Sequence, residues 1–207
     1  RIRNFKAVVD SKTVKLGPLT AFIGNNGAGK SSLIEALETY QAIVRDGLDI
    51  AMQRWLGIEH VRHKAQEAKE RMGQLVNPIS FELALGESPR KVRRLTMTVN
   101  NDPAANRMFI ASERVTDLTG DFAERDEVGA LMSYGAGRSM LAAPASLNHT
   151  LLSSEVLAWQ FLTLSPERMG LPVPQQRTKG TVRLANDGSN VADFLLDLRR
   201  LDANAFN

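Results

Sequence analysis

The first forty residues carry two kinds of apolar pattern. Residues 19–23 form a short, mostly apolar run, which is typical of a buried parallel strand. From Lys30 to about Val44 the apolar residues recur at helical spacing, and four of them share one face of the predicted helix: Leu33, Ile34, Leu37 and Tyr40. Upstream, residues 2–9 predict a first strand, with which residues 13–16 could pair across a polar turn.

The pattern changes to a period of two further along the chain. Residues 79–85 and 92–99 alternate apolar and polar positions, and residues 108–115 form a third candidate strand. Turn-rich stretches separate the three runs, so residues 79–115 predict an antiparallel β-meander. Between the first helix and this meander, residues 46–75 are mostly helical in pattern, and breaks are expected at three glycines: Gly47, Gly57 and Gly73.

The last third of the chain is less regular. Residues 116–150 are rich in Gly, Ala and Ser and predict an insertion or a mobile segment. An apolar run at 156–164 predicts a core strand, which Pro166 ends, and residues 181–184 predict a short strand. Ser189 then has the character of an N-cap for a helix that starts at Val191.

Composition narrows the class of protein. The chain is 43% hydrophobic and 24% charged, as in soluble globular proteins, and no apolar run is long enough to span a membrane. The absence of cysteine excludes disulfides and thiolate metal sites, and it fits a cytoplasmic protein. The start at Arg1 lacks a signal peptide's apolar core and suggests a trimmed N-terminus. The densest basic run, residues 90–94, is better explained as a solvated hairpin or helix face than as a nucleic-acid contact.

One motif carries recognisable chemistry. The run Gly24-Asn25-Asn26-Gly27-Ala28-Gly29-Lys30-Ser31 fills every fixed position of a P-loop, and it stands between the predicted strand and the predicted helix. Its glycines permit positive φ and a close approach of the backbone to a phosphate group. The loop N–H groups and the positive end of the helix dipole then attract phosphate oxygens.

Two side chains of the motif have specific predicted roles. Lys30 would reach the β- and γ-phosphates and is the candidate catalytic residue, and the Ser31 hydroxyl would ligate Mg²⁺. The predicted nucleotide site therefore consists of the P-loop together with the next serine: Gly24, Asn25, Asn26, Gly27, Ala28, Gly29, Lys30, Ser31 and Ser32. The predicted ligands are ATP and Mg²⁺.

The order of elements resembles a known class of ATPase. The N-terminal Ile2-Arg3-Asn4-Phe5-Lys6, the run Leu16-Gly17-Pro18-Leu19-Thr20 and the P-loop resemble the head of RecF/SMC-like ATPases of the ABC class. The segments Leu164-Ser165-Pro166-Glu167-Arg168-Met169 and Asp187-Gly188-Ser189-Asn190-Val191-Ala192 are similar to bacterial AAA-family ATPases near the OLD and RecF groups.

The resemblance implies an α/β fold: a P-loop NTPase of ABC-ATPase type, with a mixed sheet, a P-loop helix and an antiparallel β-subdomain. Residues 1–207 would form one partial head domain. It divides into residues 1–45 with the P-loop, the meander at 79–115, the insertion at 116–150, and a core strand, loop and helix at 156–207. The resemblance also implies a homodimer with two ATP molecules sandwiched between heads, work in DNA repair or anti-phage defence, and DNA or a nuclease as partner.

The chain also departs from the pattern of that class. The run Phe194-Leu195-Leu196-Asp197-Leu198 superficially resembles a Walker B strand, but it has Leu198 in place of the catalytic Glu, and its spacing is that of an amphipathic helix. A signature motif of the LSGGQ type is also missing. We therefore expect this chain to be the N-terminal half of a longer ATPase and to be inactive by itself.

The resemblance suggests further site residues. A Gln after a core strand contacts Mg²⁺ in such heads, which makes Gln175 or Gln176 the candidate and Gln160 a weaker one. Arg3 and Lys6 would lie near the nucleotide, whereas Arg168 could approach a phosphate or form a surface salt bridge. His60 and His63 are better explained as surface residues than as metal ligands.

Two functional hypotheses remain from the sequence. The first is ATP hydrolysis by the RecF/SMC-like head. The second is a nucleotide-gated binding module that holds ATP to control dimerisation or docking of DNA or a nuclease without appreciable turnover. A small P-loop kinase or GTPase is disfavoured by the meander after the first helix and by the lack of a guanine-selecting motif.

Overall fold

The computed structural model describes residues 1–64, 77–88, 91–102, 105–116, 122–126, 135–142, 147–172 and 182–202. Its strands are β1 (Ile2–Phe5), β2 (Val8–Asp10), β3 (Ile79–Ser88), β4 (Lys91–Asp102), β5 (Arg107–Thr116) and β6 (Phe122–Asp126). Its helices are α1 (Lys30–Asp46), α2 (Leu48–Gln53), α3 (Ile58–Val61), the short 3-10 helix η1 (Met140–Ala142), α5 (Leu147–Leu157), α6 (Pro166–Met169) and α7 (Val191–Leu201). The chain divides into two compact units, residues 1–159 and residues 160–207.

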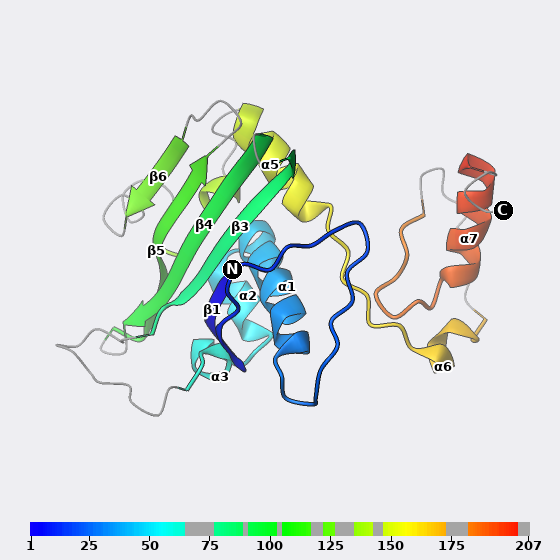
Figure 1. The fold of residues 1–207 in the computed structure, drawn as a ribbon, viewed down its shortest axis with the longest axis horizontal. Coiled ribbons are helices and arrows are strands. Elements are labelled where there is room, and N and C mark those ends of the chain that lie inside the picture. The colour runs from blue at the N-terminus through cyan, green and yellow to red at the C-terminus, as the bar shows by residue number, and fades with distance from the viewer. Residues whose placement is uncertain are drawn as a thin grey trace. The chain divides into compact units, whose positions relative to one another are not determined.

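The first unit is built on one antiparallel sheet. The strand order is β2-β1-β3-β4-β5-β6, and each neighbouring pair is antiparallel. Figure 1 labels β1 and the strands from β3 to β6 in this sheet. The three strands predicted for the meander are confirmed as β3, β4 and β5, because alternating patterns and polar turns suit hairpins with one buried face. The chain is a mixed α/β structure, but no parallel pair occurs among its described strands.

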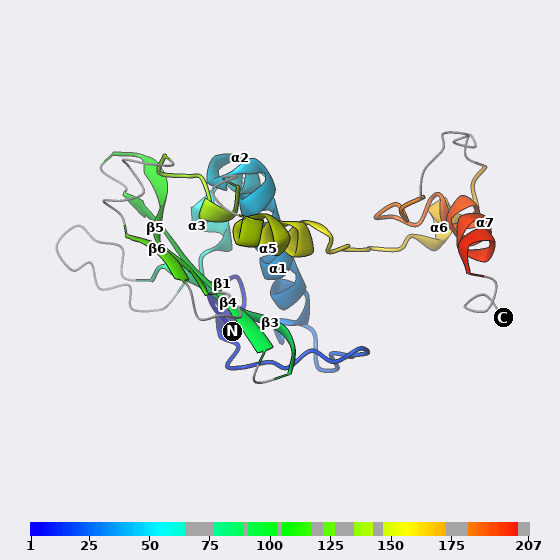
Figure 2. The same ribbon diagram turned by 90° about the horizontal axis from the view of Figure 1, so that it is seen from above.

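The core lies between this sheet and the helices on one of its faces (Figure 2). Side chains alternate along a strand, so every second residue of β4 is buried: Leu95, Met97 and Val99. The helix α1 contributes the opposite layer with Ala36, Tyr40, Ile43 and Val44. The predicted helical period is thereby confirmed, although Ile34, expected on the apolar face, is 40% exposed.

Gly47 and Gly57 interrupt the helical segments as predicted. Gly47 has φ 92° and follows α1, and Gly57 has φ 120° and precedes α3. Left-handed backbone at these positions favours glycine and breaks the helical path. The third expected break, Gly73, lies outside the described residues.

The first hairpin differs from the prediction. Residues 2–9 do not form one strand, because the chain turns at Lys6 and Ala7, and β2 pairs with β1 in the register Phe5↔Val8. Lys6 has φ 47°, a left-handed conformation that sequence patterns assign to Gly, Asn or Asp. Residues 13–16 consequently form no strand.

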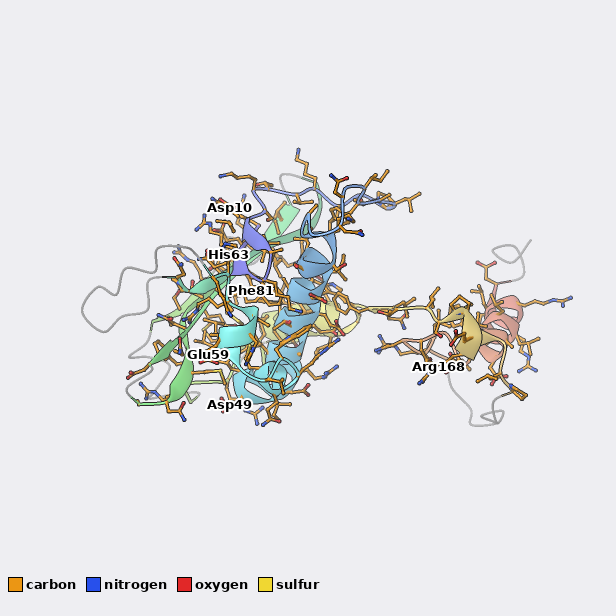
Figure 3. All side chains as sticks on the ribbon, turned by 90° about the horizontal axis from the view of Figure 1, so that it is seen from below. Asp10, Asp49, Glu59, His63, Phe81 and Arg168 are labelled. Carbon is orange, nitrogen blue, oxygen red and sulfur yellow. The ribbon has the colours of Figure 1, made fainter. Side chains whose placement is uncertain are left out.

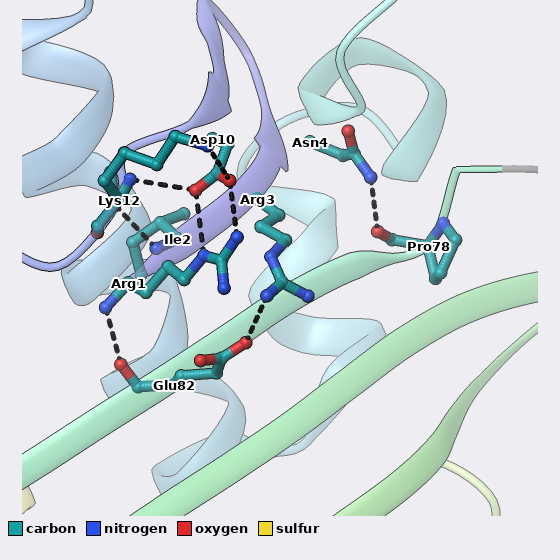
Figure 4. A network of polar contacts seen from close by, with 9 residues as sticks. Arg1, Ile2, Arg3, Asn4, Asp10, Lys12, Pro78 and Glu82 are labelled. Atoms are coloured by element: carbon teal, nitrogen blue, oxygen red, sulfur yellow. Dashed lines mark hydrogen bonds and ion pairs between the residues drawn. The ribbon is translucent and has the colours of Figure 1, made fainter.

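Polar contacts fix this hairpin to the sheet (Figure 4). Arg1 donates two hydrogen bonds to the Asp10 carboxylate, at 2.9 and 2.6 Å, and these bonds hold the pKa of Asp10 well below its usual range. Arg3 forms an ion pair with Glu82 of β3, with 2.9 Å between Nη2 and Oε1. Arg3 was predicted to lie near the nucleotide, but its guanidinium group pairs with a neighbouring strand of the sheet.

The predicted parallel strand at residues 19–23 is wrong. This segment has no strand pairing, and two of its apolar side chains are almost fully exposed, Leu19 at 94% and Ile23 at 96%. An apolar run becomes a strand only where neighbouring backbone groups complete its hydrogen bonds. Among the described strands, β1 is already flanked by β2 and β3.

Residues 135–142 are fastened to the sheet by a buried carboxylate. Glu113 of β5 accepts hydrogen bonds from the Ser139 hydroxyl, at 2.5 Å, and from the Met140 N–H, at 2.8 Å. Burial, together with the nearby Glu113 charge, raises the pKa of Tyr40 well above its ordinary value. Within the predicted insertion, this segment and β6 therefore belong to the first unit, whereas residues 117–121, 127–134 and 143–146 lie outside the description.

The core strand predicted at 156–164 is also wrong. Val156 lies in α5, which ends at Leu157, and residues 158–165 form no strand. The amide of Gln41 in α1 donates to the carbonyls of Val156 and Trp159, each at 2.9 Å, and it contacts the Leu157 carbonyl at 3.4 Å. These contacts satisfy backbone acceptors that a helix leaves open at its C-terminus.

The second unit contains α6 and α7. The Walker B-like run is part of the helix α7, as the spacing predicts, and the Asp197 carboxylate accepts a hydrogen bond from the Val182 N–H at 2.9 Å. The expected cap Ser189 is replaced by Asn190 as the residue before the helix, and residues 182–184 form no strand. Within the residues described, no helix has the length and apolarity needed to cross a membrane.

Candidate phosphate-binding site

The P-loop turns through two glycines in left-handed backbone. Gly27 has φ 83° and Gly29 has φ 86°, conformations that side chains rarely adopt. Between them, the Ala28 N–H donates to the Asn25 carbonyl at 3.2 Å and closes a tight turn. The backbone of residues 24–29 is exposed or half-buried, so a ligand can approach it.

The Lys30 side chain binds the backbone at the start of the loop. Its Nζ donates to the carbonyl oxygens of Gly24 and Asn25, both at 2.7 Å. An ammonium group has three N–H donors, so one further donor can serve a phosphate oxygen. The lysine thus draws the two ends of the loop together and places a positive charge at its centre.

The loop leads directly into the N-terminus of α1. Gly29 precedes the helix, and the first intrahelical bond runs from the Leu33 N–H to the Gly29 carbonyl at 3.0 Å. No side chain of the described residues caps this end, and the first turn contains no acidic residue. The open N–H groups and the helix dipole therefore favour an anion here.

The two serines of the motif differ in their surroundings. Ser31 is exposed in the first turn of α1, so its hydroxyl is available to ligate a metal ion beside the phosphates. Ser32 is 9% exposed and faces the core. The donor set of the loop, Lys30 and Ser31 fits a Mg²⁺-bound polyphosphate, whereas Ser32 can contribute its backbone N–H and not a free hydroxyl.

The β1–β2 turn lies against the loop. A Cβ atom added at Gly29 would come within 3.3 Å of Val8 Cγ2 and 3.9 Å of Ala7 Cβ. Lys6 in the same turn forms an ion pair with Glu35 of α1, with 2.8 Å from Nζ to Oε2, and its Nζ lies 3.5 Å from the centre of the Trp55 ring. Lys6 is near the P-loop, as the resemblance implies, but its ammonium group is directed to α1.

Sequence reasoning did not find Glu35 or Trp55. Glu35 occupies an ordinary helical position, and Trp55 lies 25 residues beyond Lys30, outside any local motif. The Trp55 Nε1 donates to the Thr39 hydroxyl at 3.0 Å, which anchors the ring to α1. Only the fold brings these side chains to the β1–β2 turn.

Several other predicted site residues have structural partners. Arg168 donates to the Asp187 carboxylate at 2.9 Å, in the manner of the surface salt bridge that was one reading of the sequence (Arg168 is labelled in Figure 3). The Asp187 pKa is lowered to about 2 by hydrogen bonds from Ser189 and by Arg168. His63 lies beside β1, and its Nδ1 is 2.7 Å from the Lys6 carbonyl (Figure 3).

The predicted glutamine of the magnesium site cannot be placed. Gln175 and Gln176 lie outside the described residues, and Gln160 is exposed at the start of the second unit. The structured ranges contain no group of three or more His, Asp or Glu residues arranged to bind a metal ion.

Comparison with known proteins identifies one domain. Residues 1–88 match the family model of an AAA ATPase domain. No curated protein and no solved structure matches the chain. The matched residues include the first hairpin, the P-loop and α1, so the match implies a P-loop NTPase domain and indicates ATP binding and hydrolysis.

Proposed function

We propose that this chain binds MgATP in the P-loop and works as the head of a RecF/SMC-like ATPase in DNA repair or anti-phage defence. The observation that carries the nucleotide site is the contact of Lys30 with the carbonyls of Gly24 and Asn25, at the open N-terminus of α1. The antiparallel sheet beside the P-loop helix supports the choice of class, because kinases and GTPases have no such meander after that helix.

The roles of the chain's own groups follow from this geometry. The loop N–H groups and the N-terminus of α1 would bind phosphate oxygens, and Lys30 would contact the β- and γ-phosphates. Ser31 would hold Mg²⁺, which neutralises charge on the phosphate oxygens when it is bound. The protein contributes positioning and charge stabilisation, which are the main sources of catalysis in phosphoryl transfer.

Substitution of Lys30 tests the nucleotide site. We expect Lys30→Ala to weaken MgATP binding at least tenfold, since hydrogen bonds to charged groups contribute about 1.5–3 kcal/mol. Lys15→Ala is the matched control, because Lys15 is an exposed lysine in the connection that leads to the same loop. Isothermal titration calorimetry of each folded variant gives the affinity. Equal affinities for wild type and Lys30→Ala would refute the proposed site.

The dimer is a separate part of the proposal. ATP sandwiched between two heads would make self-association depend on the nucleotide. Sedimentation velocity with and without MgATP measures this dependence directly. A chain that binds MgATP and keeps one sedimentation coefficient over a wide concentration range would argue against the sandwich, although the nucleotide site itself would stand.

A nucleotide-gated binding module is the second candidate. One observation favours it: the only Walker B-like aspartate of the described segments, Asp197, lies in a helix and accepts a hydrogen bond from the Val182 N–H. Phosphate release under saturating MgATP discriminates the two functions. Steady release that Lys30→Ala abolishes supports the ATPase, whereas tight binding with no release supports the module.

A further inference from the structure

The β1–β2 turn packs against the P-loop. Ala7 of the turn and Val8, the first residue of β2, lie so close to Gly29 that a methyl group there would meet Val8 Cγ2 at 3.3 Å. By contrast, a Cβ added at Gly27 would meet no heavy atom of the described residues within 4 Å. Gly29 is therefore the point at which the hairpin can influence the loop, immediately before Lys30.

Lys6 fixes the position of this turn from three sides. Its backbone N–H donates to the Val61 carbonyl at 2.6 Å, and its carbonyl accepts from His63. Its Nζ forms the ion pair with Glu35 of α1, and the two side chains are 25% and 32% exposed. Glu35 follows Lys30 by five residues in the same helix. The turn is thus tied to the same helix that carries the P-loop lysine.

Trp55 completes the attachment. The Lys6 ammonium lies 3.5 Å from the centre of the Trp55 ring, a distance at which cation–π attraction is strong. The ring nitrogen donates to Thr39 Oγ1, and that hydroxyl donates to the Glu35 carbonyl at 2.7 Å. Lys6, Trp55 and α1 therefore form one closed set of contacts, which we call the hairpin clamp (Lys6, Glu35, Thr39 and Trp55).

We propose that Lys6 is a positioning residue for the P-loop, and this inference rests on the proposed binding of MgATP. The hairpin clamp presses Ala7 and Val8 against Gly29 and so restrains the left-handed turn that aims the loop N–H groups. A loop that is already ordered loses less entropy when a ligand binds. Lys6 acts through packing, since its ammonium group is committed to Glu35 and the Trp55 ring and does not contact the phosphates.

A double-mutant cycle tests the clamp against direct phosphate contact. We expect Lys6→Met and Glu35→Gln each to weaken MgATP binding about three- to tenfold, and the double variant to be no weaker than either one, because both substitutions break the same contact. Lys6→Arg should restore most of the affinity. Lys12→Met is the matched control, because Lys12 also has positive φ and pairs with an acid, Asp10, but belongs to the other end of the hairpin.

The outcomes separate the possible failures. If Lys6→Met binds MgATP weakly while Glu35→Gln binds it with wild-type affinity, Lys6 contacts the phosphates directly and the inference is overturned. Wild-type affinity in both variants would overturn it as well. If Lys6→Met does not fold, Glu35→Gln alone decides, because it removes the charge of one side chain of α1 and keeps its size. If the wild-type chain does not bind MgATP, the proposed function is refuted, and the inference that rests on it is refuted with it.

Trp55 provides a readout that a purely structural role would not change. The chain has two tryptophans, so Trp159→Phe leaves Trp55 as the only source of tryptophan emission. MgATP should shift the Trp55 emission in this background, because a ligand at Gly29 acts through Ala7 and Val8 on the Lys6 ammonium beside the ring. The shift should disappear in Lys6→Met even at saturating MgATP. A shift that survives Lys6→Met would show that the clamp does not report on the loop.

Discussion

The two left-handed glycines of the P-loop offer a matched pair of perturbations. Gly27 and Gly29 have almost the same φ, 83° and 86°. The left-handed backbone therefore destabilises an alanine by a similar free energy at either position, about 1–2 kcal/mol. The positions differ in their neighbours. At Gly27 an added methyl group meets no heavy atom of the described residues within 4 Å, but at Gly29 it lies 3.3 Å from Val8 Cγ2. The difference between the two variants therefore isolates the contact with the hairpin.

The magnitudes follow from this geometry. Forcing an extra methyl group into a packed contact costs about 1–3 kcal/mol, so we expect Gly29→Ala to lower the free energy of unfolding by about 2–5 kcal/mol. Gly27→Ala should lower it by about 1–2 kcal/mol. For a chain of this size each kcal/mol corresponds to about 2–4 °C in the melting temperature, so Gly27→Ala should melt about 2–8 °C below wild type and Gly29→Ala clearly lower.

Thermal unfolding followed by circular dichroism measures both variants under one set of conditions. The same samples give the MgATP affinity, which should fall further for Gly29→Ala because the strained residue directly precedes Lys30. Equal melting temperatures for the two variants would refute the reasoning, since the Val8 contact would then contribute nothing to the cost.

Two further predictions concern other parts of the chain. Gln41→Ala removes the amide that donates to the carbonyls of Val156 and Trp159, so urea unfolding should show a loss of about 1–3 kcal/mol; wild-type stability would contradict this. The Asp187 pKa falls from an ordinary 3.8 to about 2 in the folded chain, so its stabilising effect is complete above pH 3.8 and is lost as the pH falls through 2. Acid unfolding of Asp187→Asn should lack this dependence, and an unchanged profile would contradict the assignment.

The features that sequence reasoning predicted are those with local causes. The P-loop turn depends on glycines at fixed spacing, and α1 depends on an apolar period that seventeen consecutive residues satisfy. The meander depends on alternation and on turn residues between the strands. Each of these signals acts within one element, so the printed sequence contains all that is needed to recognise it.

The first hairpin and the run at 19–23 lack such local causes. A left-handed Lys6 carries no sequence signal, because the conformation is imposed by bonds to residues more than fifty positions away, such as Val61 and His63. The apolar run at 19–23 satisfies the strand pattern but has no backbone partner among the described strands. Strand prediction from hydrophobicity assumes a partner, and a pattern cannot supply one.

The same distinction divides the candidate site into two parts. The groups that would meet a phosphate, Lys30 and the loop N–H groups, stand in eight consecutive residues and can be recognised by eye. The groups that restrain them come from the β1–β2 turn, from α1 and from the residues after α2, and Lys6 is 29 residues from its partner Glu35. A motif match therefore identifies the chemistry of a P-loop, whereas the order of the loop before ligand binding depends on contacts that only the folded chain provides. Variants of the hairpin clamp should change affinity without touching a single residue of the motif, which makes them the sharper test of how this loop is organised.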